Sequence, residues 1–179
     1  KFNNFKWLDN QDHLKSWQKG MTGYPIIDAG MRQLYETGYM HNRVRMIVGS
    51  FLVKNLMIHW KYGQEWFWDT LIDAHIASNS ASWQWVAGTG ADAAPYFRIF
   101  NPVTQSKKFD PNGDYIKKYI PVLKYIPSKN IHLPSELDSE SLRSYGVELG
   151  HDYPKPIVDL SITRERALDA FKELSKSTS

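Results

Sequence analysis

Cysteine is missing from the 179 residues of this chain. Its absence excludes disulfides, thiolate metal sites and cysteine nucleophiles, and it favours a reducing, intracellular compartment. Long apolar runs are missing too: the longest candidate, residues 46–60, contains Gly, Ser, Lys, Asn and His. We therefore expect neither a membrane span nor a membrane partner. The sequence has no signal-peptide pattern and no initiator Met, so we expect a piece of a larger protein.

Several common catalytic motifs are also absent. The chain has no Gly-rich phosphate loop, no GxSxG nucleophile elbow and no HExxH zinc motif, which leaves common hydrolase chemistry without visible machinery. The net charge is only +3, a weak indication of an anionic partner. Strand signals are scarce and there is no internal repeat. The scarcity of strand signals favours a helical protein.

Helix signals recur and predict an all-α fold. Pro25 in a first turn and Gly38 as a stop bound one helix, inside which residues 27, 31, 34 and 35 have helical spacing. Prolines and polar residues predict an irregular surface segment over residues 127–156. Further helices are predicted over residues 42–60, from about residue 64, around residues 80–86 and over residues 163–176. We expect one compact unit.

Aromatic residues are abundant, at 14% of the chain, and include seven tryptophans. The densest run is WQWVAGTGADAAPYFRIFNPVTQ, residues 83–105. Trp83 and Trp85 would face nearly opposite sides of a helix, and small neighbours would let a bulky partner approach the backbone. Trp7 and Trp60 are candidates for one tryptophan row with them; the alternative is ordinary aromatic packing. Aromatics, arginine and amides together suggest a redox or light-driven flavoprotein that handles nucleic acid.

A second candidate group lies on the helix that starts near residue 42. Asn42, Arg45 and Met46 are three or four residues apart and share a face. An amide can pair with base edges, a guanidinium with phosphate or a flavin carbonyl, and a thioether packs against aromatic surfaces. The alternative is a structural helix with two exposed arginines and a core methionine.

Two further groups admit two interpretations each. Asp73, His75 and Asn79 lie within seven residues, where local capping is the simpler interpretation and an Asp73–Arg45 ion pair beside a cofactor is the other. One histidine with one aspartate does not make a metal site, so we expect none. Gln105 and Lys107 precede a stretch of lysines and tyrosines typical of nucleic-acid-facing loops, or of a solvated surface.

At these residues the chain resembles the C-terminal part of the FAD-binding domain of the DNA photolyase/cryptochrome family. The resemblance implies an all-helical domain in which FAD borders a cavity that receives a nucleotide pair flipped from DNA. It also implies light-driven repair of cyclobutane pyrimidine dimers by electron transfer from reduced FAD. The matching segments are residues 22–34, 37–46, 50–56, 83–105 and 153–159.

The resemblance also assigns roles to single residues. Trp83, Trp60 and Trp7 correspond to an electron relay that photoreduces the flavin, with Trp83 nearest the flavin and Trp7 nearest solvent. The remaining assignments fall into two groups. The flavin-contacting positions are Arg45 and Asp73 as an ion pair beside the ring system, Asn79 facing flavin N5, and His75, which stands where the family usually has an acid. The substrate positions are Asn42, Met46 and Trp85 in the lesion cavity and Arg43, Gln105 and Lys107 on DNA.

The subfamily is indicated by one helix. In (6-4) photolyases and animal cryptochromes this helix typically begins with two histidines and has a third where Met46 stands. Here His41, Asn42 and Met46 resemble a class I cyclobutane pyrimidine dimer photolyase. The alternative is a cryptochrome-type blue-light photoreceptor without repair activity.

Several expectations concern the rest of the protein. Residues 1–179 would be the C-terminal portion of the FAD- and DNA-binding helical domain, inactive alone and without many of the FAD contacts. The N-terminal antenna domain, with its chromophore, would lie outside this chain. We expect damaged DNA and that N-terminal part as partners. The expected location is the cytoplasm, associated with the nucleoid, in a bacterium or the nucleus in a eukaryote.

Overall fold

The computed structural model of the chain describes residues 6–71 and 99–177. Within these residues the fold is helical, as predicted, and β pairing is limited to an isolated bridge between Leu149 and Tyr153. The longer helices are α1 (Gln11–Gln18), α2 (Pro25–Thr37), α3 (Asn42–Ser50), α4 (Trp60–Thr70), α6 (Pro102–Phe109), α7 (Asp114–Tyr119), α8 (Ser139–Ser144) and α9 (Leu160–Ser177). Shorter helical segments are η1 (Phe51–Asn55), η2 (Pro121–Leu123) and η3 (Pro134–Glu136).

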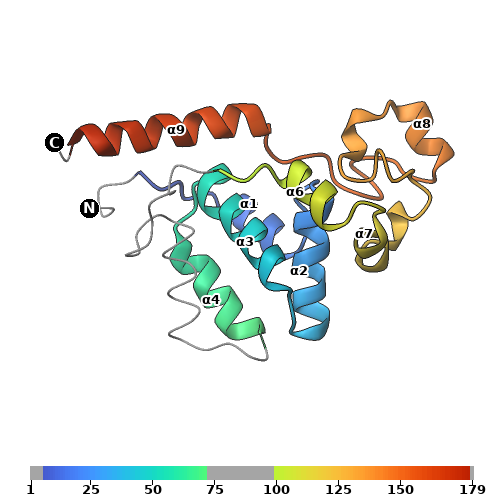
Figure 1. Cartoon of the computed structure of the whole chain (residues 1–179), viewed down its shortest axis with the longest axis horizontal. Coiled ribbons are helices and arrows are strands. Elements are labelled where there is room, and N and C mark those ends of the chain that lie inside the picture. Colours follow the sequence, from blue (N-terminus) through green and yellow to red (C-terminus); the bar gives the residue numbers. More distant parts are fainter. Residues whose placement is uncertain (1–5, 72–98, 178–179) are drawn as a thin grey trace.

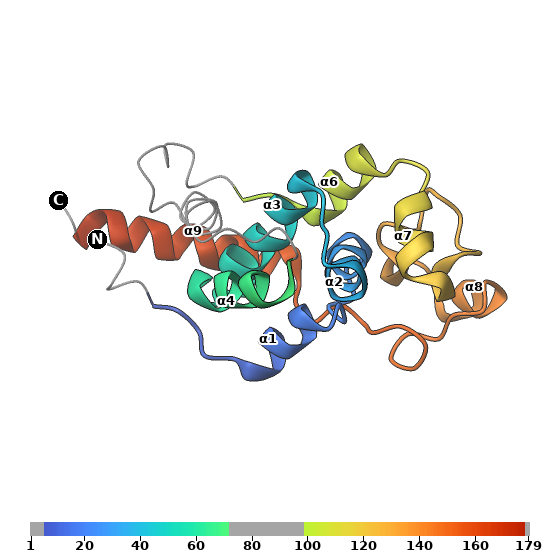
Figure 2. The same cartoon turned by 90° about the horizontal axis from the view of Figure 1, so that it is seen from below.

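Helix α2 lies at the centre of the arrangement. It packs against α1, α3, α6 and α7, while α4 and α9 pack against η1. Figures 1 and 2 show α4 and α9 on one side of α2, and α7 and α8 on the other. Among the described helices, none is long and apolar enough to cross a lipid bilayer.

The bounds of α2 follow from its sequence. Pro25 occupies the first turn, where its missing N–H costs nothing and its fixed φ suits a helix. Gly38 ends the helix in the left-handed region, at φ 72°, and donates its N–H to the Leu34 carbonyl. Both predicted boundaries of this helix are confirmed.

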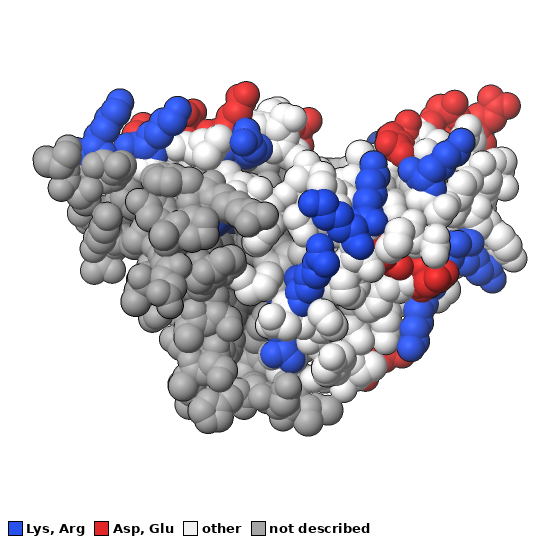
Figure 3. Space-filling model, in the orientation of Figure 1, with Lys and Arg blue, Asp and Glu red and all other residues white. Residues whose placement is uncertain are grey.

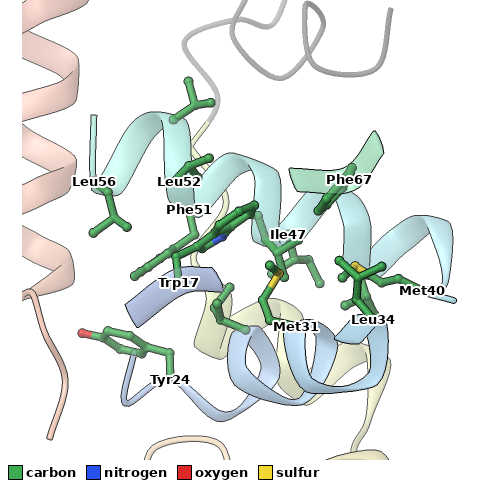
Figure 4. Close-up of a cluster of buried hydrophobic side chains, with 14 of the residues drawn as sticks. Trp17, Tyr24, Met31, Leu34, Met40, Ile47, Phe51, Leu52, Leu56 and Phe67 are labelled. Carbon is green, nitrogen blue, oxygen red and sulfur yellow. The ribbon is translucent and has the colours of Figure 1, made fainter. Parts of the chain in front are cut away.

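The main core lies between α1, α2, α3, η1 and α4 (Figure 4). Trp17 of α1 is fully buried there, stacks on Phe67 of α4 with ring centroids 6.0 Å apart, and donates its indole N–H to the Val48 carbonyl at 3.0 Å. That hydrogen bond satisfies the polar end of a large apolar side chain inside the core. A second cluster, beneath α7 and α8, includes Ile116 and Leu142.

A glycine lets α2 and α3 approach closely. A Cβ on Gly30 would lie 2.5 Å from Cγ1 of Val44 on α3, which no side chain tolerates without movement. The buried face of α3 therefore rests directly on the backbone of α2. This contact fixes the direction of the opposite face of α3, which carries Asn42 and Arg45.

The carboxyl group of Asp28 connects distant parts of the chain. It is fully buried and accepts four hydrogen bonds, from the Thr22 N–H (2.8 Å), the Thr22 hydroxyl (2.7 Å), the Gly23 N–H (3.0 Å) and the Tyr153 hydroxyl. Burial raises the pKa of Asp28, while the hydrogen bonds from Tyr153 and Thr22 act in the opposite direction. The start of α2 is thereby tied to the segment that precedes α9.

The predicted helix over residues 42–60 is correct as far as residue 55, where its last turn is π-helical, and wrong beyond it. Helix α3 ends at Ser50, a π-helical turn follows over Phe51–Asn55, and a new helix begins at Trp60 rather than near residue 64. Met57, in the left-handed region at φ 53°, separates the two helices, and His59 caps the second one. The apolar pattern runs through this break because residues 51–58 are all buried.

The remaining predictions fare differently. The segment over residues 127–156 is largely irregular as predicted, but it also contains η3 and α8. The last helix begins at Leu160, slightly earlier than predicted, where the Asp159 carboxylate accepts a hydrogen bond from the Ile162 N–H. The helix predicted around residues 80–86 lies outside the described residues.

We expect Tyr153→Phe to lower the free energy of unfolding by about 2 kcal/mol, because Asp28 would lose a buried hydrogen-bond donor. Urea unfolding followed by circular dichroism measures this. Tyr145→Phe is the control, since Tyr145 is half-buried in the same cluster and its hydroxyl makes no hydrogen bond to another described residue; it should change stability by no more than about 0.5 kcal/mol. Equal effects of the two variants would contradict the role given to Tyr153.

Candidate functional site

Helix α3 presents one buried face and one polar face. Val44, Ile47 and Val48 are buried, and the His41 side chain caps the helix by accepting a hydrogen bond from the Arg43 N–H at 3.1 Å. The polar face was predicted from spacing. It consists of the exposed side chains of Asn42 and Arg43 and the half-buried side chains of Arg45 and Met46. Asn42 of the predicted face is therefore exposed, Arg45 is half-buried, and the half-buried Met46 packs against the main core.

Arg45 is held by the chain just before its own helix. Its Nε donates a hydrogen bond to the Met40 carbonyl at 2.8 Å, and Met40 is itself buried. This bond fixes the root of a planar group whose N–H donors suit carboxylate, phosphate or ring-carbonyl oxygens. The arginine that sequence analysis placed beside a cofactor is thus oriented by the fold.

Trp7 and Trp60 meet at a common neighbour, His59. The His59 ring lies 5.1 Å from the Trp7 ring and 5.1 Å from the Trp60 ring, centroid to centroid. The two indole centroids are therefore no farther apart than about twice that distance. Both indoles are half-buried, and they come from positions 53 residues apart in the sequence.

Trp7 is brought to this place by the segment before α1. The Leu8 N–H donates to the Met57 carbonyl at 2.7 Å, which pairs the segment with the turn that precedes α4. Trp7 also packs beside Met57 and Phe171, the latter on α9. The indole is thus held from two sides, by the turn and by the last helix.

Helix α6 positions the other two predicted residues. Its start is capped by Asn101, whose side chain accepts hydrogen bonds from the Val103 N–H (2.9 Å) and the Thr104 N–H (3.2 Å). Ser106 anchors its buried side by a 2.6 Å hydrogen bond to Nδ1 of His132. Gln105 is therefore half-buried and Lys107 exposed, on a helix that packs against α3.

Basic side chains gather on this face. Lys and Arg follow one another across the middle of the molecule, where α6 lies, whereas Asp and Glu gather over α8 (Figure 3). The exposed basic residues on α3, α6 and α7 are Arg43, Lys107, Lys108 and Lys118. A polyanion would meet favourable charge on this face.

The structure brings together only part of the predicted site. Trp83, Asp73, His75, Asn79 and Trp85 lie outside the described residues. His59 was missed, although its place immediately before Trp60 could have drawn attention to it.

Comparison with known proteins assigns the chain to a family. The family model described as the FAD binding domain of DNA photolyase matches residues 1–173. This chain belongs to that family. A deoxyribodipyrimidine photo-lyase of Agrobacterium fabrum is 56% identical over 177 residues, covering 99% of this chain and 37% of the relative. One from Escherichia coli is 50% identical, covering 96% of this chain and 35% of the relative.

Solved structures agree with the fold. A class III photolyase from Agrobacterium tumefaciens matches with a TM-score of 0.95 at 56% identity, over 98% of this chain and 36% of the other. A Synechocystis cryptochrome matches with a TM-score of 0.90 at 44% identity, over 93% and 34%. The predicted helical fold of the photolyase type is confirmed. The chain spans about a third of the length of these proteins. The description class III does not support the expected class I, so the subclass stays a prediction.

Proposed function

We propose that the protein to which this chain belongs is a deoxyribodipyrimidine photo-lyase, which uses light to repair cyclobutane pyrimidine dimers in DNA. Residues 1–179 would form the C-terminal portion of its helical FAD- and DNA-binding domain, and the antenna domain would lie in another part of the protein. The observation that carries the proposal is the meeting of Trp7 and Trp60 at His59, in a chain of the photolyase family. Packing alone does not require two indoles at one half-buried imidazole.

The polar face of α3 fits a flavin. Arg45 would offer its guanidinium, whose Nε is already held by the Met40 carbonyl, to a ring-carbonyl oxygen. Asp73, His75 and Asn79 are assigned to the same cofactor by resemblance. FAD, when bound and reduced, supplies the light-excited electron that splits the dimer and takes it back afterwards.

The tryptophans would keep the cofactor reduced. Indole is the side chain most easily oxidised among those near this site, and neighbouring rings in contact allow an electron to move in short steps. Trp60 would pass an electron inward and recover one from Trp7, with Trp83 completing the relay toward the flavin. Repair itself needs no electron from this relay once the flavin is reduced.

The substrate would lie on the α3 and α6 side. Asn42 can pair with the edge of a flipped base, Met46 can pack against the saturated ring of the dimer, and Trp85 would stack on it. Arg43, Gln105 and Lys107 would contact the DNA backbone around the lesion, where the exposed cations of α3 and α6 already gather (Figure 3).

A cryptochrome-type photoreceptor is the second candidate, favoured by the 44% identity to the Synechocystis protein. It would use the same relay without repairing DNA. Asn42 and Met46 favour repair, and a dimer-splitting assay on the full-length protein separates the two functions.

We expect Trp60→Phe in the full-length protein to slow photoreduction of bound FAD at least about tenfold, because a phenyl ring is much harder to oxidise than an indole. Repair by chemically reduced enzyme should stay nearly unchanged. Trp68→Phe is the matched control, since Trp68 lies on the same helix and is 46% exposed. Absorption spectra under blue light measure the rate. Equal loss of repair and photoreduction would argue against a relay.

We expect Met46→Ala to weaken binding of dimer-containing DNA about fivefold, because the lesion would lose apolar contact area. Flavin content should not change. Met21→Ala, at an exposed methionine in the turn before α2, is the control. Titration with a lesion-bearing oligonucleotide provides the affinities. An unchanged affinity would remove Met46 from the lesion cavity.

We expect Arg43→Ala to weaken DNA binding and to reduce the slope of log affinity against log salt by about one, because one phosphate contact would be lost. Arg143→Ala is the control, since Arg143 is exposed on α8 among acidic residues. Binding at several salt concentrations measures both slopes. If Arg143→Ala flattened the slope as much as Arg43→Ala, the proposed DNA face would be wrong.

A further inference from the structure

His59 has two structural tasks at once. It is the N-cap of α4, and its Nδ1 accepts a hydrogen bond from the Lys61 N–H at 3.0 Å. Because that nitrogen accepts, the neutral ring carries its proton on Nε2. The same ring contacts Trp7 and Trp60, at interplanar angles of 59° and 33°.

Because of this position, the charge on His59 affects the transfer of an electron between the two indoles. When an electron moves from Trp7 to Trp60, positive charge moves from Trp60 to Trp7, and both rings lie 5.1 Å from the imidazole. A positive charge on His59 therefore opposes positive charge on either indole, which disfavours the oxidation of Trp60 that must come first. A neutral imidazole offers no such opposition.

We propose that His59 is a gating residue of the tryptophan relay, which conducts while the imidazole is neutral and is blocked when the imidazole is protonated. The inference rests on the proposed function, because it gives the relay a regulating group. His59 acts through Trp7 and Trp60 and is a positioning residue, not a catalytic one.

The electron transfer from Trp7 to Trp60 that His59 would gate needs no further reactant from the protein. One electron leaves the Trp7 indole and fills the vacancy on Trp60, so Trp60 is restored and Trp7 carries one positive charge. Trp7 then receives an electron from an external reductant, a thiol in the assay below. His59 keeps its proton count throughout, and no bond is made or broken on it.

The surroundings of His59 favour the neutral form. Burial lowers the pKa of His59 from its ordinary value of 6.5, and the positive charge of Lys61 lowers it further. The other charged groups on its own helix and on the elements packed around it are Lys6 and Asp9 before α1, Lys54 on η1, Glu65 and Asp69 on α4, and Arg164, Glu165, Arg166, Asp169, Lys172, Glu173 and Lys176 on α9. Among the described residues Lys61 is the charged group that shifts this pKa. The relay would therefore conduct at neutral pH and close as the pH falls below 6.5.

Two measurements on the full-length protein test the gate. The first is the rate of FAD photoreduction between pH 5 and pH 8 with a thiol as reductant, which should fall at least about tenfold at the acid end. The second uses the FAD-free protein, in which tryptophan fluorescence should decrease with the same midpoint, because a protonated imidazole quenches a neighbouring indole.

His59→Asn removes the titrating group but keeps an N-cap oxygen for the Lys61 N–H. Both pH dependences should become flat within about twofold. His59→Ser, another capping residue, provides the same test if the asparagine variant folds poorly. His13→Asn is the control, because His13 is half-buried on α1 with a lowered pKa, and it should retain the wild-type profile.

The outcomes separate the gate from the relay. A flat wild-type profile, or an acid decrease that persists in His59→Asn, overturns the gate. If Trp60→Phe also fails to slow photoreduction at pH 8, the relay itself is wrong and the proposed function loses its support. A slow Trp60→Phe variant with a flat wild-type profile would refute the gate alone.

Discussion

The buried carboxyl group of Asp28 is the constraint on which the other positions depend. A carboxyl group taken out of water is costly unless its oxygens are hydrogen-bonded, and here four donors from Thr22, Gly23 and Tyr153 meet it. They join the turn before α2 to Tyr153, which lies 125 positions after Asp28. The start of α2, against which α1, α3, α6 and α7 pack, is thereby fixed from outside its own helix.

Once the start of α2 is fixed, local features of the backbone determine the geometry of the candidate site. Gly30 lets α3 lie on α2, which leaves Asn42 exposed and Arg45 and Met46 half-buried. The π-helical turn after α3 and the left-handed Met57 then redirect the chain, so that α4 begins at Trp60 beside the N-terminal segment. Each of these steps is set by backbone geometry, and together they bring Trp7 and Trp60 into contact with His59.

The helices could be predicted because local sequence signals define them, whereas contacts between residues far apart in the sequence could not. Pro25, Gly38 and the spacing of apolar residues identified α2, and a 3.6-residue period identified the polar face of α3 and the last helix. The break between Asn55 and Trp60 was not predicted because residues 51–58 are all buried, Lys54 and Asn55 included, and apolar residues continue directly after these two. The Asp28–Tyr153 hydrogen bond and the proximity of Trp7 to Trp60 depend on the fold. The abundance of tryptophan suggested a row that includes Trp7 and Trp60, and the family resemblance assigned that row a relay role, which remains a proposal.

His59 shows why one side chain can couple helix structure to charge transfer. Its Nδ1 is an acceptor in the cap of α4, and protonation would turn that acceptor into a donor facing the Lys61 N–H. The same proton would place a positive charge 5.1 Å from each of the two indoles. Loss of the cap opposes this protonation, and burial together with Lys61 also keeps the ring neutral. An ionised carboxylate at this position would cap the helix equally well. It would stabilise positive charge on the indoles throughout the pH range around neutrality, so the rate of photoreduction would not respond to pH.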